Sequence, residues 1–206
     1  MLKLERKYYS SEVKAIVGVD EAGRGPLAGP VYAAAVVFPR GYKNKEINDS
    51  KKLSAKKREE LFEVIKQHAL GYGIASVSAD EIDTLNIYEA TKVCMSKAIE
   101  QIQCPYQLIL TDAMPLSGQS CPVVPIIKGD AQCLNIAAAS ILAKVSRDRY
   151  MVELEKRYPA YKFSVHKGYG TALHLQELQT NGPIPHVHRK TFGPVAAYYE
   201  QQLKLF

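Results

Sequence analysis

The chain has 206 residues, enough for one α/β domain with a sizeable core. Its 27 lysines and arginines against 21 aspartates and glutamates give a net charge of +6, which favours polyanionic partners. Residues 1–7 lack the apolar region of a signal peptide, and the longest apolar run, 31–38, is too short to span a membrane. We therefore expect a cytoplasmic protein without a membrane span, whose cysteines are free thiols.

Short apolar runs bounded by turn residues alternate with stretches of helical periodicity along the chain. In chain order we expect strands at 15–19 and 31–38, a helix at 54–68 with Ser54 as N-cap, a strand at 73–77, one helix at 78–103 opened by a capping box, strands at 106–111 and 122–127, a long helix at 134–157, a loop at 166–171, a short helix, and a last helix at about 194–205. This alternation indicates an α/β fold in which helices cover a mixed sheet. Residues 1–206 contain no repeat or linker, so we expect a single domain.

Acidic residues stand at the ends of three expected strands. Asp20 and Glu21 end the first strand, Asp112 ends the strand at 106–111, and Asp130 follows the strand at 122–127. Because open α/β sheets gather their sites beyond the strand ends, these carboxylates can converge. A lone strand-end aspartate is more often a cap, but four carboxylates without a matching histidine or cysteine set favour Mg²⁺ or Mn²⁺ over zinc.

A glycine-rich turn, Gly23-Arg24-Gly25, follows the first pair of acids directly. Its glycines allow backbone N–H groups to approach a ligand closely, and the arginine offers a fork of donors suited to a phosphate. Carboxylates for a divalent metal beside a turn that can hold a phosphodiester predict metal-assisted chemistry on nucleic acid.

The chain contains seven short motifs, in this order: 17–31 (VGVDEAGRGPLAGPV), 48–53 (NDSKKL), 110–113 (LTDA), 127–130 (IKGD), 138–148 (AASILAKVSRD), 166–171 (HKGYGT) and 188–192 (HRKTF). In these blocks, and in their order, the chain resembles the type 2 ribonuclease H family, specifically the bacterial ribonuclease HII group. The resemblance implies a ribonuclease H-like mixed β-sheet flanked by helices, with a C-terminal helical and loop segment. The catalytic core would cover about 14–192, and a C-terminal helix and tail about 193–206.

The resemblance also implies an activity. Such an enzyme cleaves the RNA strand of RNA–DNA hybrids and nicks 5′ of ribonucleotides embedded in duplex DNA, leaving 5′-phosphate and 3′-hydroxyl ends. It would serve ribonucleotide removal in DNA replication and repair, as a monomer. The catalytic residues would be the four acids, which would hold two Mg²⁺ or Mn²⁺ ions: Asp20, Glu21, Asp112 and Asp130.

Two further features are implied to read the substrate. Gly23, Arg24 and Gly25 would hold the ribose 2′-OH and the neighbouring phosphate, which distinguishes RNA from DNA. Tyr169 matches a tyrosine that stacks on the sugar following the ribonucleotide and requires deoxyribose there. The alternative for Tyr169 is core packing, but the flanking glycines indicate a loop.

Basic and polar residues elsewhere are candidates for phosphate contacts. Ser140, Lys144 and Arg147 recur at i, i+4 and i+7 of the long helix, so one face could follow a DNA strand, although ordinary helix-surface chemistry is an equal reading for Arg147. Lys51 and Lys128 are further candidates. The basic stretch 43–58 is either a solvated helix face or a phosphate-binding patch. The pair His186 and His188 leaves zinc open as a minor alternative.

The last five residues resemble a peptide that binds the bacterial sliding clamp. Leu203, Leu205 and Phe206 would supply apolar anchors, and Gln202 would fix the orientation. Lys204 departs from the serine or aspartate most typical of that position. The alternative is that Leu203 and Phe206 dock on the core of the same chain.

Three alternative functions fit the sequence less well. The related ribonuclease HIII group is expected to carry a sizeable N-terminal substrate-binding domain, whereas only nineteen residues precede Asp20. A catalytically silent hybrid-binding module would lack an acid of the cluster, and all are present. Likeness to transposases or junction resolvases would explain the acids but neither the Gly23–Gly25 turn nor the Tyr169 loop. The nuclease is the reading we adopt.

Overall fold

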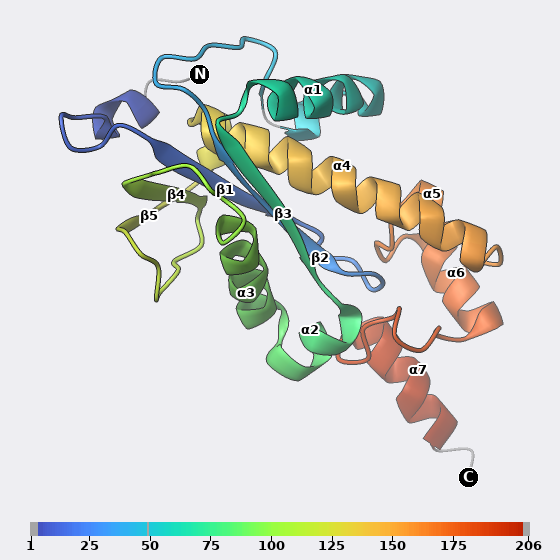
Figure 1. The fold of residues 1–206 in the computed structure, drawn as a ribbon. Helices are drawn as coiled ribbons and strands as arrows, with labels where there is room; N and C mark the ends of the chain where they lie inside the picture. Colours follow the sequence, from blue (N-terminus) through green and yellow to red (C-terminus); the bar gives the residue numbers. More distant parts are fainter. Residues whose placement is uncertain (1–3, 49, 204–206) are drawn as a thin grey trace.

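A mixed β-sheet organises the part of the chain that the computed structural model describes, which is residues 4–48 and 50–203, with side chains as far as Gln201. The strands within it form one five-stranded sheet in the order β3-β2-β1-β4-β5 (Figure 1). Their bounds are β1 Ile16–Ala22, β2 Val31–Val37, β3 Gly71–Val77, β4 Leu108–Asp112 and β5 Val123–Ile126. β2 pairs antiparallel with β1 and β3, whereas β4 pairs parallel with β1 and β5. The expected mixed α/β sheet is confirmed.

Helices cover both faces of this sheet (Figure 1). On one face, α4 (Leu134–Arg157) and α1 (Ala55–His68) bury apolar side chains against Ala34 and Val36 of β2. On the other face, α3 (Ile87–Ile99) packs on the alternate residues of β1 and β2. The remaining elements are η1 Glu5–Tyr8, η2 Ser50–Lys52, α2 Ala79–Leu85, η3 Gly129–Ala131, α5 Phe163–His166, α6 Ala172–Asn181 and α7 Gly193–Leu203.

Glycine at position 18 brings β1 and α4 unusually close together. A Cβ atom at Gly18 would lie 2.2 Å from the carbonyl carbon of Asn135, so no larger residue fits there. The Asn135 side chain in turn donates a hydrogen bond to the carbonyl of Ile16. Because side chains alternate along a strand, Asp20 points to the same face as Gly18 and therefore toward α4.

Three sequence-based expectations about the elements need correction. The single helix expected at 78–103 is two, α2 and α3, because Asn86 takes a left-handed φ of 68° and its side chain caps the amides of Tyr88 and Glu89. β1 does not end before the acids but continues through Ala22. The apolar spacing of the helix expected at 134–157 predicts that Val152 points inward, but this residue of α4 is 38% exposed.

Other expectations are confirmed. Ser54 caps α1, and Ser78 forms the capping box with Glu81. The cysteines are free thiols. Within the described residues, no helix has both the length and the apolar character needed to cross a membrane.

α5 and α6 lie beside the C-terminal end of α4 (Figure 1), and the segment before α7 contacts the loop after β1. An isolated β-bridge joins Ala28 to His188. Backbone hydrogen bonds run from the Gly29 amide to the carbonyl of Val187 and from the Arg189 amide to the carbonyl of Leu27. The loop after β1 is therefore held by residues from the other end of the sequence.

Candidate active site

Three carboxylates converge at one edge of the sheet. Asp20 comes from β1, Asp112 ends β4, and Asp130 lies in η3 after β5. One oxygen from each lies within 4.8 Å of the others. The convergence follows from topology, because β1, β4 and β5 are parallel neighbours whose carboxyl ends meet at the same edge.

Burial and mutual repulsion both disfavour the charged forms of these acids. Asp20 and Asp130 are buried, and Asp112 is half-buried. Burial, reinforced by the charges of Glu21 and Asp112, raises the pKa of Asp20 well above its usual range. Backbone amides orient the carboxylates, since the Glu21 N–H donates to Asp20 Oδ1 at 2.7 Å and the Gly129 N–H donates to Asp112 Oδ1 at 2.8 Å.

Glu21 stands beside this trio without belonging to it. Its Oε1 is 3.5 Å from Nη1 of Arg24, and burial raises the pKa of its carboxyl. Its other oxygen, Oε2, is buried and has no hydrogen-bond partner within the described part of the chain. A buried carboxylate oxygen without a partner is costly, and a cation would remove that cost.

The donor set fits a hard divalent cation. Mutually repelling carboxylates need a positive charge between them, and all the ligands are oxygens, as Mg²⁺ and Mn²⁺ prefer. One basic group close to the cluster is exposed: Lys51 Nζ lies 3.7 Å from Asp130 Oδ2, with 82% of its side chain exposed.

Asp20, Glu21 and Asp112 open into a pocket of about 270 Å³ that also contains the glycine-rich turn and Tyr169. Its lining residues are Asp20, Glu21, Ala22, Gly23, Arg24, Gly25, Ser50, Lys51, Arg58, Asp112, Ser140, Lys144 and Tyr169. The Tyr169 side chain is exposed rather than packed in the core, and its ring lies close to Gly25. The pocket therefore brings together residues from five separate parts of the sequence.

Two buried arginines build the wall behind this turn, and one of them corrects a prediction. Arg147, expected as a phosphate contact, is fully buried and donates to the backbone carbonyls of Pro30, Ala28 and Lys167. It cannot reach a DNA backbone, because the loops after β1 and α5 fold over it. A Cβ on Gly23 would lie 2.1 Å from its Nε, so a glycine is required there.

Arg189 is the second arginine, and sequence reasoning assigned it no role. It is also fully buried, and it donates to the carbonyls of Gly23, Arg24 and Gly29 at 2.7, 2.9 and 3.0 Å. The sequence feature that could have indicated a role for Arg189 is its place in the HRKTF block at 188–192.

The remaining phosphate candidates occupy different settings. Ser140 is buried, with its Oγ 2.9 Å from that of Ser50, and its hydroxyl opposes the rise in the pKa of Asp20. Lys144 pairs with Asp148 at 2.7 Å. Lys128 is exposed before η3 and does not line the pocket.

Part of the basic stretch 43–58 contacts other groups of the protein, although most of its lysines are exposed. Lys57 pairs with Glu46, and Arg58 donates to the carbonyls of Ser50 and Leu53. Lys51 faces the acids. The stretch is therefore more than a solvated helix face.

Two groups of candidate residues from the sequence remain, which are the histidine pair and the proposed clamp peptide. His186 is exposed and contacts Asp80, whereas His188 is buried against His174, so the two rings have different partners. In the proposed clamp peptide, Gln202 and Leu203 end α7 without described side chains, and Leu205 and Phe206 lie outside the described residues.

Comparison with known proteins gives consistent matches. A family model described as Ribonuclease HII matches residues 17–195. The Ribonuclease HII of Acholeplasma laidlawii (strain PG-8A) is 52% identical over 200 residues, covering 97% of this chain and 98% of the relative. That of Ruminiclostridium cellulolyticum is 52% identical over 192 residues, covering 93% and 75%.

Solved structures are similar in fold. The ribonuclease H2 from Pyrococcus horikoshii OT3 has a TM-score of 0.79 at 26% identity and covers 92% of this chain and 99% of its own. The RNase HII in the PCNA:RNase HII complex from Archaeoglobus fulgidus has a TM-score of 0.68 at 26% identity, with 85% and 92% covered. Bst-RNase HIII in complex with Mn²⁺ has a TM-score of 0.68 at 16% identity, covering 94% and 72%, and shows the shared fold alone.

Proposed function

This chain belongs to the ribonuclease HII family, a family of metal-dependent hydrolases that cleave the RNA of RNA–DNA hybrids, and on that premise we propose that it also nicks duplex DNA 5′ of single embedded ribonucleotides. The observation that carries the proposal is the pocket itself. It places Asp20 and Asp112 of the converging carboxylates, together with Glu21, beside a glycine-rich turn and an exposed tyrosine ring. These are the parts needed to cut a phosphodiester and to read the sugars around it.

We assign the metal to the acid cluster. Asp20, Asp112 and Asp130 would hold Mg²⁺ or Mn²⁺, and Glu21 would contribute its unpartnered Oε2. Held by these residues, two metal ions would supply activation of a water and stabilisation of the leaving 3′-oxygen, giving 5′-phosphate and 3′-hydroxyl ends. The protein's own part is to hold the carboxylates rigidly, through the amides of Glu21 and Gly129.

We assign recognition to the rest of the pocket. The backbone of Gly23–Gly25 would bind the ribose 2′-OH, and Arg24, whose side chain is 45% exposed, would bind the neighbouring phosphate. Tyr169 would stack on the following sugar and favour deoxyribose. Phosphate contacts along the duplex would come from Lys51, Lys128, Ser140 and Lys144.

The test uses a DNA duplex with one labelled, embedded ribonucleotide, incubated with Mg²⁺, Mn²⁺ or EDTA. We expect a single nick 5′ of the ribonucleotide with either metal, none with EDTA, and none in an all-DNA duplex. Asp112→Asn should lower turnover by at least about 100-fold, since even outer partners of metal ligands cost 10–100-fold. Glu153→Gln, an exposed acid of α4, is the matched control and should behave as wild type.

Cleavage in EDTA, or near-normal turnover of Asp112→Asn, would contradict the assignment of the metal to this cluster.

We further propose a role in ribonucleotide removal during DNA replication and repair, aided by a sliding clamp that binds residues 202–206. The A. fulgidus relative, which was solved as a complex with PCNA, supports such a partner. Tethering to a clamp would raise the local concentration of the enzyme on newly replicated DNA.

A further inference from the structure

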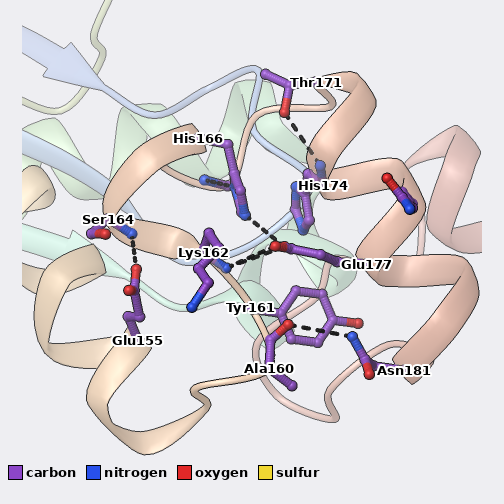
Figure 2. Close-up of polar contacts among 12 residues, drawn as sticks. Glu155, Ala160, Tyr161, Lys162, Ser164, His166, Thr171, His174, Glu177 and Asn181 are labelled. Carbon is purple, nitrogen blue, oxygen red and sulfur yellow. Dashed lines mark hydrogen bonds and ion pairs between the residues drawn. The ribbon is translucent and has the colours of Figure 1, made fainter.

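Three histidine rings lie together inside the C-terminal part of the molecule, and Figure 2 shows two of them, His166 and His174. His166 ends α5, His174 lies in α6, and His188 lies in the segment before α7. The rings of His166 and His174 stack with centroids 4.2 Å apart, and His188 lies 5.3 Å from His174. We call these three residues the histidine cluster. Their burial is nearly complete, and none of them has a part in the proposed cleavage.

Backbone amides fix the proton position on two of these rings. The Gly168 N–H donates to Nδ1 of His166, and the Ile184 N–H donates to Nδ1 of His188. A nitrogen that accepts a hydrogen bond carries no proton, so each neutral ring has its proton on Nε2. His166 therefore donates from Nε2 to Glu177 Oε2 at 3.0 Å (Figure 2).

The proton position on the third ring, His174, follows from that on His188. His188 donates from Nε2 to Nε2 of His174 at 3.1 Å, so His174 must carry its proton on Nδ1. That Nδ1–H lies 2.9 Å from the backbone carbonyl of Tyr169 and donates to it. His188 and His174 thus form a one-way chain of hydrogen bonds that ends on the residue proposed to read the substrate sugar, and His166 stacks beside it.

The loop that carries Tyr169 is short and has an unusual backbone. Lys167 and Gly168 have left-handed φ values of 51° and 81°. A Cβ on Gly168 would lie 2.5 Å from the carbonyl oxygen of Ala28. Arg147 and the Leu27 amide hold the carbonyls of Lys167 and Gly168. The third successive carbonyl, that of Tyr169, accepts from the Thr171 amide within the loop and from His174, which is the donor from outside the loop.

We propose that His174, oriented by His188, is a positioning residue that holds Tyr169 in place for reading the sugar beside a ribonucleotide. The proposal rests on the proposed function of Tyr169 as that reader. By junction selectivity we mean the ratio of kcat/KM for a duplex with one embedded ribonucleotide to kcat/KM for a continuous RNA–DNA hybrid. The histidine cluster would support junction selectivity without touching the substrate.

The surroundings keep these rings neutral, which the chain of bonds requires. Burial and the neighbouring rings lower the pKa of His174 and His188. Glu177 accepts from His166 and from the Lys162 amide, so its charge is balanced by donors (Figure 2). The other titratable groups facing the histidine cluster are Tyr161, Glu155 and Lys167.

The test compares variants of one side chain. His174→Leu removes the donor to the Tyr169 carbonyl. His174→Asn keeps an N–H close to the position of Nδ1 and is the conservative rescue. Tyr161→Phe is the matched control, because it removes a different hydrogen bond of the same region, from the Tyr161 hydroxyl to the Gly182 carbonyl. If His174→Leu does not fold, His174→Gln, whose amide reaches the Nε2 end, takes its place.

Two measurements separate the outcomes. Amide hydrogen exchange over residues 166–171 should rise in His174→Leu but not in His174→Asn or Tyr161→Phe. Junction selectivity should fall by about fivefold in His174→Leu, the size expected from one neutral hydrogen bond, and adding His174→Leu to Tyr169→Ala should lower it no further than Tyr169→Ala alone.

Unchanged exchange and unchanged junction selectivity in His174→Leu would overturn the inference, as would an equal loss in Tyr161→Phe. Failure of the proposed function has a different signature. In that case Tyr169→Ala alone would leave junction selectivity unchanged, while the exchange result would still decide whether His174 positions the loop.

Discussion

The Nη2 atom of Arg189 lies 2.7 Å from the carbonyl oxygen of Gly23, although 166 positions separate the two residues in the sequence. The same guanidinium also donates to the carbonyls of Arg24 and Gly29. A planar group with donors in a fixed fork holds three carbonyls in one relative orientation, which an ammonium cannot do. The shape of the turn beside the acid cluster is therefore set from the C-terminal part of the chain.

Arg189→Lys should lower both stability and cleavage. A lysine keeps the charge but loses the fork, so buried carbonyls are left without donors. We expect the free energy of unfolding to fall by roughly 3 kcal/mol and cleavage to fall by about tenfold or more at temperatures where the variant is folded. Denaturant unfolding and single-turnover cleavage would measure these effects. Lys190→Gln, at an exposed neighbour, is the control, and an equal effect there would refute the assignment.

Asp20→Asn should abolish cleavage while raising stability in the presence of a chelator. Its buried charge lies beside those of Asp112 and Glu21, and the amide removes that repulsion while Oδ1 can still accept from the Glu21 N–H. Thermal unfolding with EDTA should show a higher Tm for the variant than for wild type. Binding to hybrid duplex should survive, because it rests on distributed phosphate contacts. A lower Tm in EDTA would show that the cluster is not electrostatically strained.

Tyr169→Ala should lower cleavage at a single embedded ribonucleotide by about 10–100-fold, the range expected from loss of one sugar or base stacking contact. Because this side chain is exposed, stability should change little. Tyr88→Ala, at a tyrosine of similar exposure on α3, provides the control. Parallel losses in cleavage and in non-specific DNA affinity would mark Tyr169 as structural.

Stability should fall as the pH drops below about 6.5. Burial lowers the pKa of His174 to about 4 and that of His188 to about 3. Between pH 6.5 and 4 the unfolded chain therefore binds protons that the folded chain does not. Each of these histidines removes about 1.4 kcal/mol of unfolding free energy per pH unit in that interval.

Chemical unfolding measured from pH 7 to pH 4.5 would test this dependence. His174→Asn should lose the share of the slope that belongs to one histidine. His68→Asn, at an exposed ring of α1, should keep the full slope. Identical slopes in wild type and His174→Asn would refute the prediction.

Deletion of residues 202–206 should leave cleavage of naked duplex and the Tm nearly unchanged, yet abolish co-elution with the sliding clamp. A short anchor peptide contributes to binding and not to the core. A large loss of Tm would instead favour docking of the tail on its own chain, and unchanged clamp binding would exclude the tail as the anchor.

The sequence by itself determined the elements and the acids. Apolar periodicity located the strands and most helices, because burial of one face imposes a local pattern. The acids at strand ends could be expected to meet, because parallel neighbouring strands end at one edge of a sheet. The split at Asn86 escaped prediction, since its two helices share an almost continuous apolar stripe.

Only the tertiary structure decided what surrounds those acids. Helical spacing placed Arg147 on a polar face, but loops from residues 28–30 and 167 cover it and accept its hydrogen bonds. Arg189 and His174 likewise act on backbone carbonyls, at Gly23 and Tyr169. Every residue carries such a carbonyl, so no local pattern marks which one a distant side chain will hold. The supports of the pocket are therefore set by the path of the folded chain.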